Sequence, residues 1–220
     1  MPKLRETHYS EAELIKVFGL TRLSGNQALP RLAQWTSAPA PVLSEADQRL
    51  FDDIAHEAQA KIAAWNEEER KMNFIAFVLR LGHLLGSSTF NTYFERPIAA
   101  TIKGRRLKTK TDFMIAKGVL DMPETPYFHF QEWKKHKDPT GDPVAQLLEA
   151  FLIAQANNND EKPLYGCTVT GKFWDFFVME GATYAISKSY DCTEREELSQ
   201  IIGMLQEFKR ILETQLIKDN

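Results

Sequence analysis

An acidic and a basic residue, Glu132 and Lys134, lie two positions apart in the aromatic segment 127–134. Five of the eight residues in this segment are aromatic, histidine included, which predicts a buried strand. Because side chains alternate between the two faces of a strand, Glu132 and Lys134 share one face with Phe128 and Phe130. The pattern therefore predicts a carboxylate and an ammonium that converge on the same space.

A second carboxylate, Asp112, lies in the preceding strand-like segment, residues 105–116. Two carboxylates from adjacent strands can hold a divalent ion, and an ammonium beside them can orient or activate water. Two simpler interpretations stay open at this point. Asp112 could instead be an aspartate that caps a hairpin turn. Glu132 and Lys134 could instead form an exposed ion pair on an edge strand.

The spacing of Glu132 and Lys134 is not rare in this chain. It occurs three more times: at Glu69 and Lys71, at Asp160 and Lys162, and at Glu207 and Lys209. The first and last of these pairs lie in helical patterns, where side chains two residues apart point away from each other, and the middle pair lies in a polar loop. Only the strand pattern aligns both charges.

A helix is expected directly after this strand. Asp142 is predicted to be its N-cap and Pro143 its first residue, and the helix should extend to about Ala156. Gln146 falls in the first turn, close to the end of the Glu132 strand.

This order of elements resembles the PD-(D/E)XK nuclease superfamily: a helix, a strand, the strand with Asp112, the strand with Glu132 and Lys134, then the helix with Gln146. Within it, the chain is most similar to the N-terminal nuclease domains of type I restriction enzymes and their small stand-alone relatives. The resemblance covers roughly residues 65–190 and departs at the first motif, where Thr111 stands before Asp112 in place of proline.

The resemblance implies an α/β fold with a restriction-endonuclease-like core, which is a central mixed sheet flanked by helices. It implies that Asp112, Glu132 and the backbone carbonyl of Trp133 hold Mg²⁺ or Mn²⁺, that Lys134 positions or deprotonates the attacking water, and that Gln146 holds water or phosphate. The implied substrate is nucleic acid, with DNA favoured over RNA, and the implied partner is a restriction or repair protein. The alternative is a non-catalytic nucleic-acid-binding or assembly module that keeps this fold.

Other charged residues fit two roles each. Four acidic residues could add a ligand to the site: Glu67, Glu68, Glu69 and Glu95. The first three also suit a first helical turn, where acids complement the helix dipole. Eight basic or histidine residues flank the site and fit either a solvated surface or a phosphate-tracking surface: Lys103, Arg105, Arg106, Lys108, Lys110, Lys135, His136 and Lys137.

The composition is that of a globular protein, with 220 residues, of which 43% are hydrophobic and 26% charged. The net charge of −3 argues against a polybasic binding protein. Cys167 and Cys192 form neither a disulfide framework nor a zinc site. Because no apolar segment reaches membrane length, we expect a cytoplasmic protein that does not enter a membrane.

We expect two parts, a helical extension at residues 1–64 and a nuclease-like domain at residues 65–220. Patterns of the capping-box type start at Ser10, Ser44 and Asn66, and another at Thr193 should open a long C-terminal helix. One apolar stripe of that helix should pack on the sheet: Leu198, Ile201, Ile202, Leu205, Phe208 and Leu212.

Overall fold

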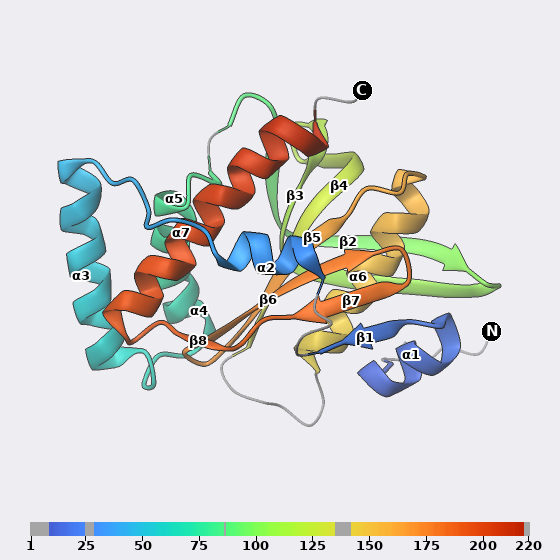
Figure 1. The fold of residues 1–220 in the computed structure, drawn as a ribbon, viewed down its shortest axis with the longest axis horizontal. Coiled ribbons are helices and arrows are strands. Elements are labelled where there is room, and N and C mark those ends of the chain that lie inside the picture. Colours follow the sequence, from blue (N-terminus) through green and yellow to red (C-terminus); the bar gives the residue numbers. More distant parts are fainter. Residues whose placement is uncertain (1–8, 25–28, 86, 135–141, 218–220) are drawn as a thin grey trace.

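A mixed eight-stranded sheet flanked by helices forms the centre of the computed structural model, which describes residues 9–24, 29–85, 87–134 and 142–217 (Figure 1). The strand order is β1-β7-β6-β5-β4-β3-β2, and β8 pairs with β6. The pairs β1 with β7 and β4 with β5 are parallel, and the other neighbouring pairs are antiparallel.

Helices and strands follow one another in groups: helices α2 to α5 precede β2 to β4, α6 separates β4 from β5, and α7 follows β8. The strands are β1 (Thr21–Leu23), β2 (Asn91–Ile102), β3 (Arg105–Val119), β4 (Met122–Lys134), β5 (Leu164–Thr170), β6 (Phe173–Glu180), β7 (Thr183–Ile186) and β8 (Tyr190–Asp191). The helices are α1 (Glu11–Phe18), α2 (Pro30–Thr36), α3 (Glu45–Lys61), α4 (Glu67–Arg70), α5 (Ala76–Leu81), α6 (Pro143–Asn158) and α7 (Arg195–Ile211), with π-helical turns η2 (Lys71–Ile75) and η3 (Leu212–Leu216).

Each face of the sheet carries its own apolar core. Helices α1 and α6 pack on one face, where their apolar residues join Met114 and Phe130. Helices α2, α3, α5 and α7 pack on the other face, where they join Phe113 and Ile115. The predicted stripe of α7 is confirmed, because all of its members are buried in this second core: Leu198, Ile201, Ile202, Leu205, Phe208 and Leu212.

Helix α6 connects the parallel strands β4 and β5, and a glycine sets how closely it packs on them. A Cβ atom on Gly166 would lie 2.7 Å from the carbonyl oxygen of Phe130 and 2.9 Å from side-chain atoms of Leu147 and Phe151. Only glycine fits this close approach.

Two predicted helix starts near the site are confirmed. Asn66 and Glu69 form a reciprocal capping box at the start of α4. Asp142 caps α6 by accepting the backbone N–H of Val144 at 3.0 Å, and Pro143 is the first residue of that helix.

The prediction for Thr193 is wrong. The N-cap of helix α7 is Glu194, one residue later than predicted, because the backbone N–H and the hydroxyl of Thr193 both donate to Asp191 Oδ1.

The N-terminal extension contributes to the sheet as well as supplying helices. Strand β1, which the sequence did not indicate, pairs in parallel with β7 at the edge of the sheet. Leu14 and Phe18 of α1 are buried in the core under α6, and Val17 is half-buried against it.

Phe128 lies on the opposite face from the one predicted. The β3–β4 register pairs Ile115 with His129 but Ala116 with Tyr127, so Phe128 is an extra residue in a bulge. A bulge resets the alternation of side chains. Phe128 therefore packs under α7, whereas Phe130 packs under α6.

Candidate active site

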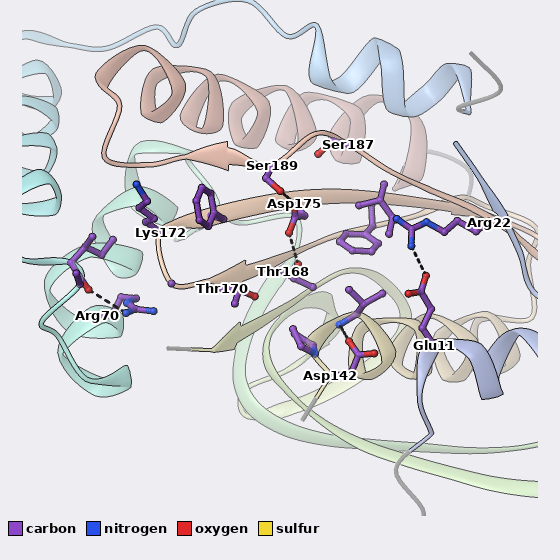
Figure 2. Close-up of a pocket in the computed structure, with 18 residues that line it drawn as sticks. Glu11, Arg22, Arg70, Asp142, Thr168, Thr170, Lys172, Asp175, Ser187 and Ser189 are labelled. Carbon is purple, nitrogen blue, oxygen red and sulfur yellow. Dashed lines mark hydrogen bonds and ion pairs between the residues drawn. The ribbon is translucent and has the colours of Figure 1, made fainter. Parts of the chain in front are cut away.

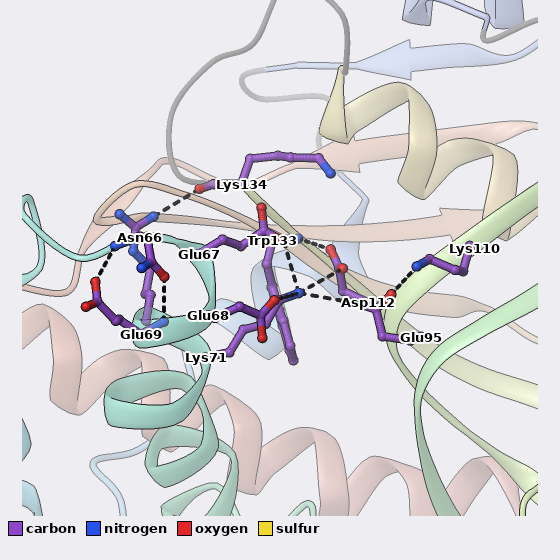
Figure 3. A network of polar contacts seen from close by, with 11 residues as sticks. Asn66, Glu67, Glu68, Glu69, Lys71, Glu95, Lys110, Asp112, Trp133 and Lys134 are labelled. Carbon is purple, nitrogen blue, oxygen red and sulfur yellow. Dashed lines mark hydrogen bonds and ion pairs between the residues drawn. The ribbon is translucent and has the colours of Figure 1, made fainter.

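Asp112 lies where the β3–β4 ladder ends. The last backbone pair toward this end joins Phe113 to Gln131. Beyond it, the Asp112 side chain replaces the backbone, because its Oδ2 accepts the N–H of Trp133 at 2.7 Å (Figure 3). The carboxylate is 7% exposed, and burial raises its pKa, although the Trp133 N–H and the Lys71 ammonium act in the opposite direction. Asp112 is therefore fixed at the end of two strands, and it does not close a turn.

Glu95 of β2 lies opposite Asp112 in the neighbouring pair of strands. The bridged pairs on either side are Phe94 with Phe113 and Arg96 with Thr111, and Glu95 itself has a φ of 56°. A left-handed backbone at a residue other than glycine costs about 1–3 kcal/mol and is concentrated at functional sites. The strained backbone of Glu95 thus faces the predicted site.

Glu132 is the most deeply buried acid of the site. It is 1% exposed, and its Oε1 has no hydrogen-bond partner among the described residues. Burial raises its pKa well above the ordinary range, and the nearby Asp112 carboxylate raises it further. Glu132 follows Phe130 on the side of the sheet that α6 covers, and it pairs in register with Thr168 of β5. It is no edge-strand residue, because β4 has neighbours on both sides.

Lys134 ends β4 at the same end of the ladder. Its carbonyl oxygen accepts hydrogen bonds from Arg70 Nη1 at 3.1 Å and from the N–H of Gly171 at 2.9 Å. The positive charge of its ammonium lowers the pKa of both Asp112 and Glu132, although within the described part of the chain it forms no ion pair with either. The two hydrogen bonds to its carbonyl fix the backbone of Lys134, and they leave its amine able to contact a bound molecule.

Gln146 lies in the first turn of α6, and its Oε1 is buried without a hydrogen-bond partner among the described residues. One turn later, Glu149 is 4% exposed and accepts the N–H of Tyr9 at 3.2 Å. Its carboxylate also raises the pKa of Glu132. Sequence reasoning missed Glu149, although an acid three residues after Gln146 in an apolar helix was a usable signal.

Lys71 is the other residue that sequence reasoning missed. Its Nζ lies within 3.6 Å of four carboxylates: 2.9 Å from Glu67, 3.2 Å from Glu95, 3.5 Å from Glu68 and 3.6 Å from Asp112 (Figure 3). Burial opposes the charge of Lys71, but the ion pairs outweigh burial and raise its pKa. Of the four acids whose role was open, Glu69 alone stays apart, since it belongs to the capping box.

Some lysines of the predicted basic surface bind other groups of the same chain. Lys110 forms an ion pair with Glu95, and Lys103 donates to the carbonyl of Phe18 at 2.9 Å. The other basic group of the prediction, Lys135, His136 and Lys137, lies outside the described residues.

A cavity of about 1040 Å³ lies beside the end of β4 (Figure 2). Its walls include Arg70, which holds the carbonyl of Lys134, and Thr168, which pairs with Glu132. Asp142 of the α6 cap and the polar side chains of Thr170 and Asp175 also contribute to its walls. Asp112, Glu132, Lys134 and Gln146 do not line this cavity, so it offers space for a polar molecule beside β5, one strand away from Glu132.

Comparison of the sequence with known protein families and with curated proteins finds no match. Among the residues that the structure describes, no helix is long and apolar enough to cross a membrane. A functional assignment for this chain consequently depends on the geometry of the site.

Proposed function

We propose that this chain is a metal-dependent nuclease of the PD-(D/E)XK type with a restriction-endonuclease-like core. It would hydrolyse phosphodiester bonds in nucleic acid, and we favour DNA over RNA as the substrate. The observation that carries the proposal is Glu132, whose buried Oε1 lacks a partner within the described chain beside a second buried acid, Asp112. A buried polar oxygen without a hydrogen-bond partner costs free energy, and a divalent ion bound to Glu132 would supply the partner that this oxygen lacks.

A divalent ion fits the chemistry of these residues. Carboxylate and carbonyl oxygens are the ligands that Mg²⁺ and Mn²⁺ prefer. Asp112 and Glu132 would hold the ion together with the backbone carbonyl of Trp133. The described residues contain no group of three or more His, Cys, Asp or Glu side chains placed to hold a metal, so backbone, substrate or water oxygens would complete the set.

Each group of the proposed site has its own role in the hydrolysis. A bound divalent ion supplies positive charge that stabilises the charge developing on the phosphoryl oxygens. Lys134 orients the attacking water and, as a neutral amine, takes its proton; as an ammonium it stabilises the same developing charge. Gln146 holds the water or a phosphate oxygen through its amide. Arg70 acts through Lys134, because it fixes the backbone from which the amine extends.

A non-catalytic nucleic-acid-binding or assembly module is the second candidate. It is favoured by the absence of a three-residue metal group from the described residues and by the ion pair with Lys71 that already occupies one oxygen of Asp112. In such a module, Lys134 and Glu132, which form no ion pair with each other within the described chain, would have no catalytic role.

Cleavage assays separate the two candidates. Supercoiled plasmid, single-stranded DNA and RNA are incubated with wild type, Lys134→Ala and the control Lys61→Ala, in Mg²⁺, Mn²⁺ or a chelator. Lys61 lies on the exposed surface of α3, where it pairs with Glu57. The proposal expects metal-dependent cleavage by wild type and by the control but not by Lys134→Ala. Equal cleavage by all three would exclude the mechanism, and DNA binding without cleavage would favour the module.

A further inference from the structure

The cavity of about 1040 Å³ lies at the N-terminal end of α6, on the face of the sheet that this helix covers, and we call it the β5–β6 cavity (Figure 2). Side chains of β5 and β6 form its floor: Thr168, Thr170, Phe173, Asp175 and Phe177. Its volume is at the upper end of the range for pockets that hold a small molecule, which is about 300–1000 Å³. The cavity can therefore receive a group much larger than water.

One row of side chains leads from the proposed site into the β5–β6 cavity. Lys134 of β4 pairs in register with Thr170 of β5, and Thr170 pairs with Phe173 of β6. Paired residues of neighbouring strands share a face of the sheet, so all three lie on the α6 side. Two strand spacings of about 4.8 Å place Phe173 roughly 10 Å from Lys134. A molecule held at the end of β4 can thus extend across β5 to the Phe173 ring.

Phe173 offers an aromatic surface at this place. It is 43% exposed, whereas Phe177, the other phenylalanine that lines the cavity, is fully buried. The Lys172 ammonium lies 5.3 Å from the centre of the Phe173 ring and forms an ion pair with Asp191 at 2.5 Å, so the lysine is held beside the ring. An accessible ring in a polar cavity is suited to stacking against another flat group.

A second row ends at a carboxylate. Glu132 pairs in register with Thr168, and Thr168 pairs with Asp175 of β6. Asp175 Oδ1 accepts the hydroxyl of Ser189 at 2.5 Å, and its Oδ2 accepts the hydroxyl of Thr168 at 3.5 Å (Figure 2). A carboxylate has about four lone-pair positions. Asp175 can therefore accept further N–H donors from a molecule in the cavity.

The two ends of the β5–β6 cavity differ in charge. Arg70 and Lys172 lie at one end, and the ion pair of Glu11 with Arg22 lies at the other (Figure 2). Arg70 donates to the carbonyl of Lys134 at 3.1 Å and to that of Ile62 at 3.2 Å, which fixes its guanidinium beside the end of β4. Positive charge at that end favours a phosphate group there.

An unpaired base matches the remaining groups. Every base has a flat face that stacks on an aromatic ring, and several bases carry amino groups that a carboxylate accepts. A base inside a duplex reaches neither Phe173 nor Asp175, because its faces are stacked and its edge is paired. We propose that the β5–β6 cavity receives an unpaired base of the substrate strand, stacked on Phe173 and hydrogen-bonded to Asp175, so that the chain prefers single-stranded nucleic acid to duplex. The inference rests on the proposed function, because it takes the end of β4 as the place of the scissile phosphate.

Binding in a chelator tests the inference without cleavage. Fluorescence anisotropy measures the affinity of labelled single-stranded oligo-dC, its RNA equivalent and the DNA duplex for wild type, Phe173→Ala and the control Phe77→Ala. Phe77 of α5 is 37% exposed and does not line the cavity. Wild type should bind single strands more tightly than duplex. Phe173→Ala should bind a single strand about 5–140-fold more weakly, as expected for the loss of one stacked base, and Phe77→Ala should bind as wild type does.

A second variant tests the contact to the base edge and covers the case in which Phe173→Ala folds poorly. Cytosine presents an amino donor where thymine presents a carbonyl oxygen, and both are pyrimidines. Wild type should therefore bind oligo-dC more tightly than oligo-dT, and Asp175→Asn should reduce this ratio at least several-fold. An equal ratio in wild type and Asp175→Asn would overturn the proposed contact.

The outcomes separate this inference from the proposed function. Equal affinity of wild type for single strand and duplex, or wild-type affinity of Phe173→Ala for both the DNA and the RNA single strand, would overturn the inference. If metal-dependent cleavage persists in that case, the proposed nuclease stands. Weaker single-strand binding by Phe173→Ala, together with no cleavage of any substrate by wild type, would support the base-binding cavity and contradict the nuclease.

Discussion

Glu149 of α6 makes the stability of this protein depend on pH in a way that can be calculated. Its carboxyl group is 4% exposed and accepts the N–H of Tyr9, which ties the start of the described chain to α6. Burial raises the pKa of Glu149 from 4.5 to about 7, against the opposing effect of the Tyr9 hydrogen bond. The folded protein therefore holds a proton that the unfolded chain releases.

The sign and size of the effect follow from proton linkage. Below pH 4.5 the group is protonated in both states and has no effect. Between pH 4.5 and about 7, only the unfolded chain loses the proton, so the free energy of unfolding falls as pH rises. At about 1.4 kcal/mol per pH unit, this interval corresponds to a loss of about 3 kcal/mol that is complete above pH 7.

Urea unfolding at pH 4.5 and pH 8 measures this loss. The proteins are wild type, Glu149→Gln and the control Glu45→Gln, whose side chain is exposed on α3. Relative to wild type, Glu149→Gln should gain about 3 kcal/mol between the two pH values, because glutamine keeps an acceptor for Tyr9 but does not titrate. Glu45→Gln should follow wild type. If wild type and Glu149→Gln change equally with pH, the argument from burial fails.

Three further substitutions test the packing and the site. Gly166→Ala should lower the free energy of unfolding in urea by about 1–3 kcal/mol or more, since its Cβ meets Phe130, Leu147 and Phe151; an unchanged midpoint would contradict the close packing of α6. Leu14→Ala should cost about 2–5 kcal/mol in the same assay if α1 is an integral part of the fold. Asp112→Asn should abolish any rise in melting temperature on adding Mn²⁺, and a rise equal to that of wild type would exclude Asp112 as a ligand.

The sequence predicted those parts of the fold that short-range interactions determine. The capping box of Asn66 and the Asp142-Pro143 start of α6 each depend on residues within three positions, and both are confirmed. The turn at Gly171 between β5 and β6 is also determined locally, because glycine readily adopts the φ of 65° that this turn needs. The face of Phe128 could not be predicted, since the bulge that turns it depends on pairing with β3.

The same distinction holds for the candidate site. Asp112, Glu132 and Lys134 could be proposed because strand alternation and the order of strands place them near one another. Lys71 could not be proposed as a site residue, because its spacing from Glu69 carries no information. Its partners Glu95 and Asp112 are 24 and 41 positions away in the sequence and contact it only when α4 packs against the sheet. Glu67 and Glu68 follow the local i,i+4 and i,i+3 spacing to Lys71, whereas tertiary packing alone adds Glu95 and Asp112 to the carboxylates around this ammonium.

The rate at which Lys134→Ala nicks supercoiled plasmid in saturating Mg²⁺, relative to wild type, tests the central claim most directly. If the Lys134 amine acts on the attacking water, the rate should fall by about 10²–10⁴-fold, while the circular dichroism spectrum and melting temperature stay those of the wild type. Lys61→Ala, prepared in parallel, should nick at the wild-type rate. A wild-type rate in Lys134→Ala would contradict the account.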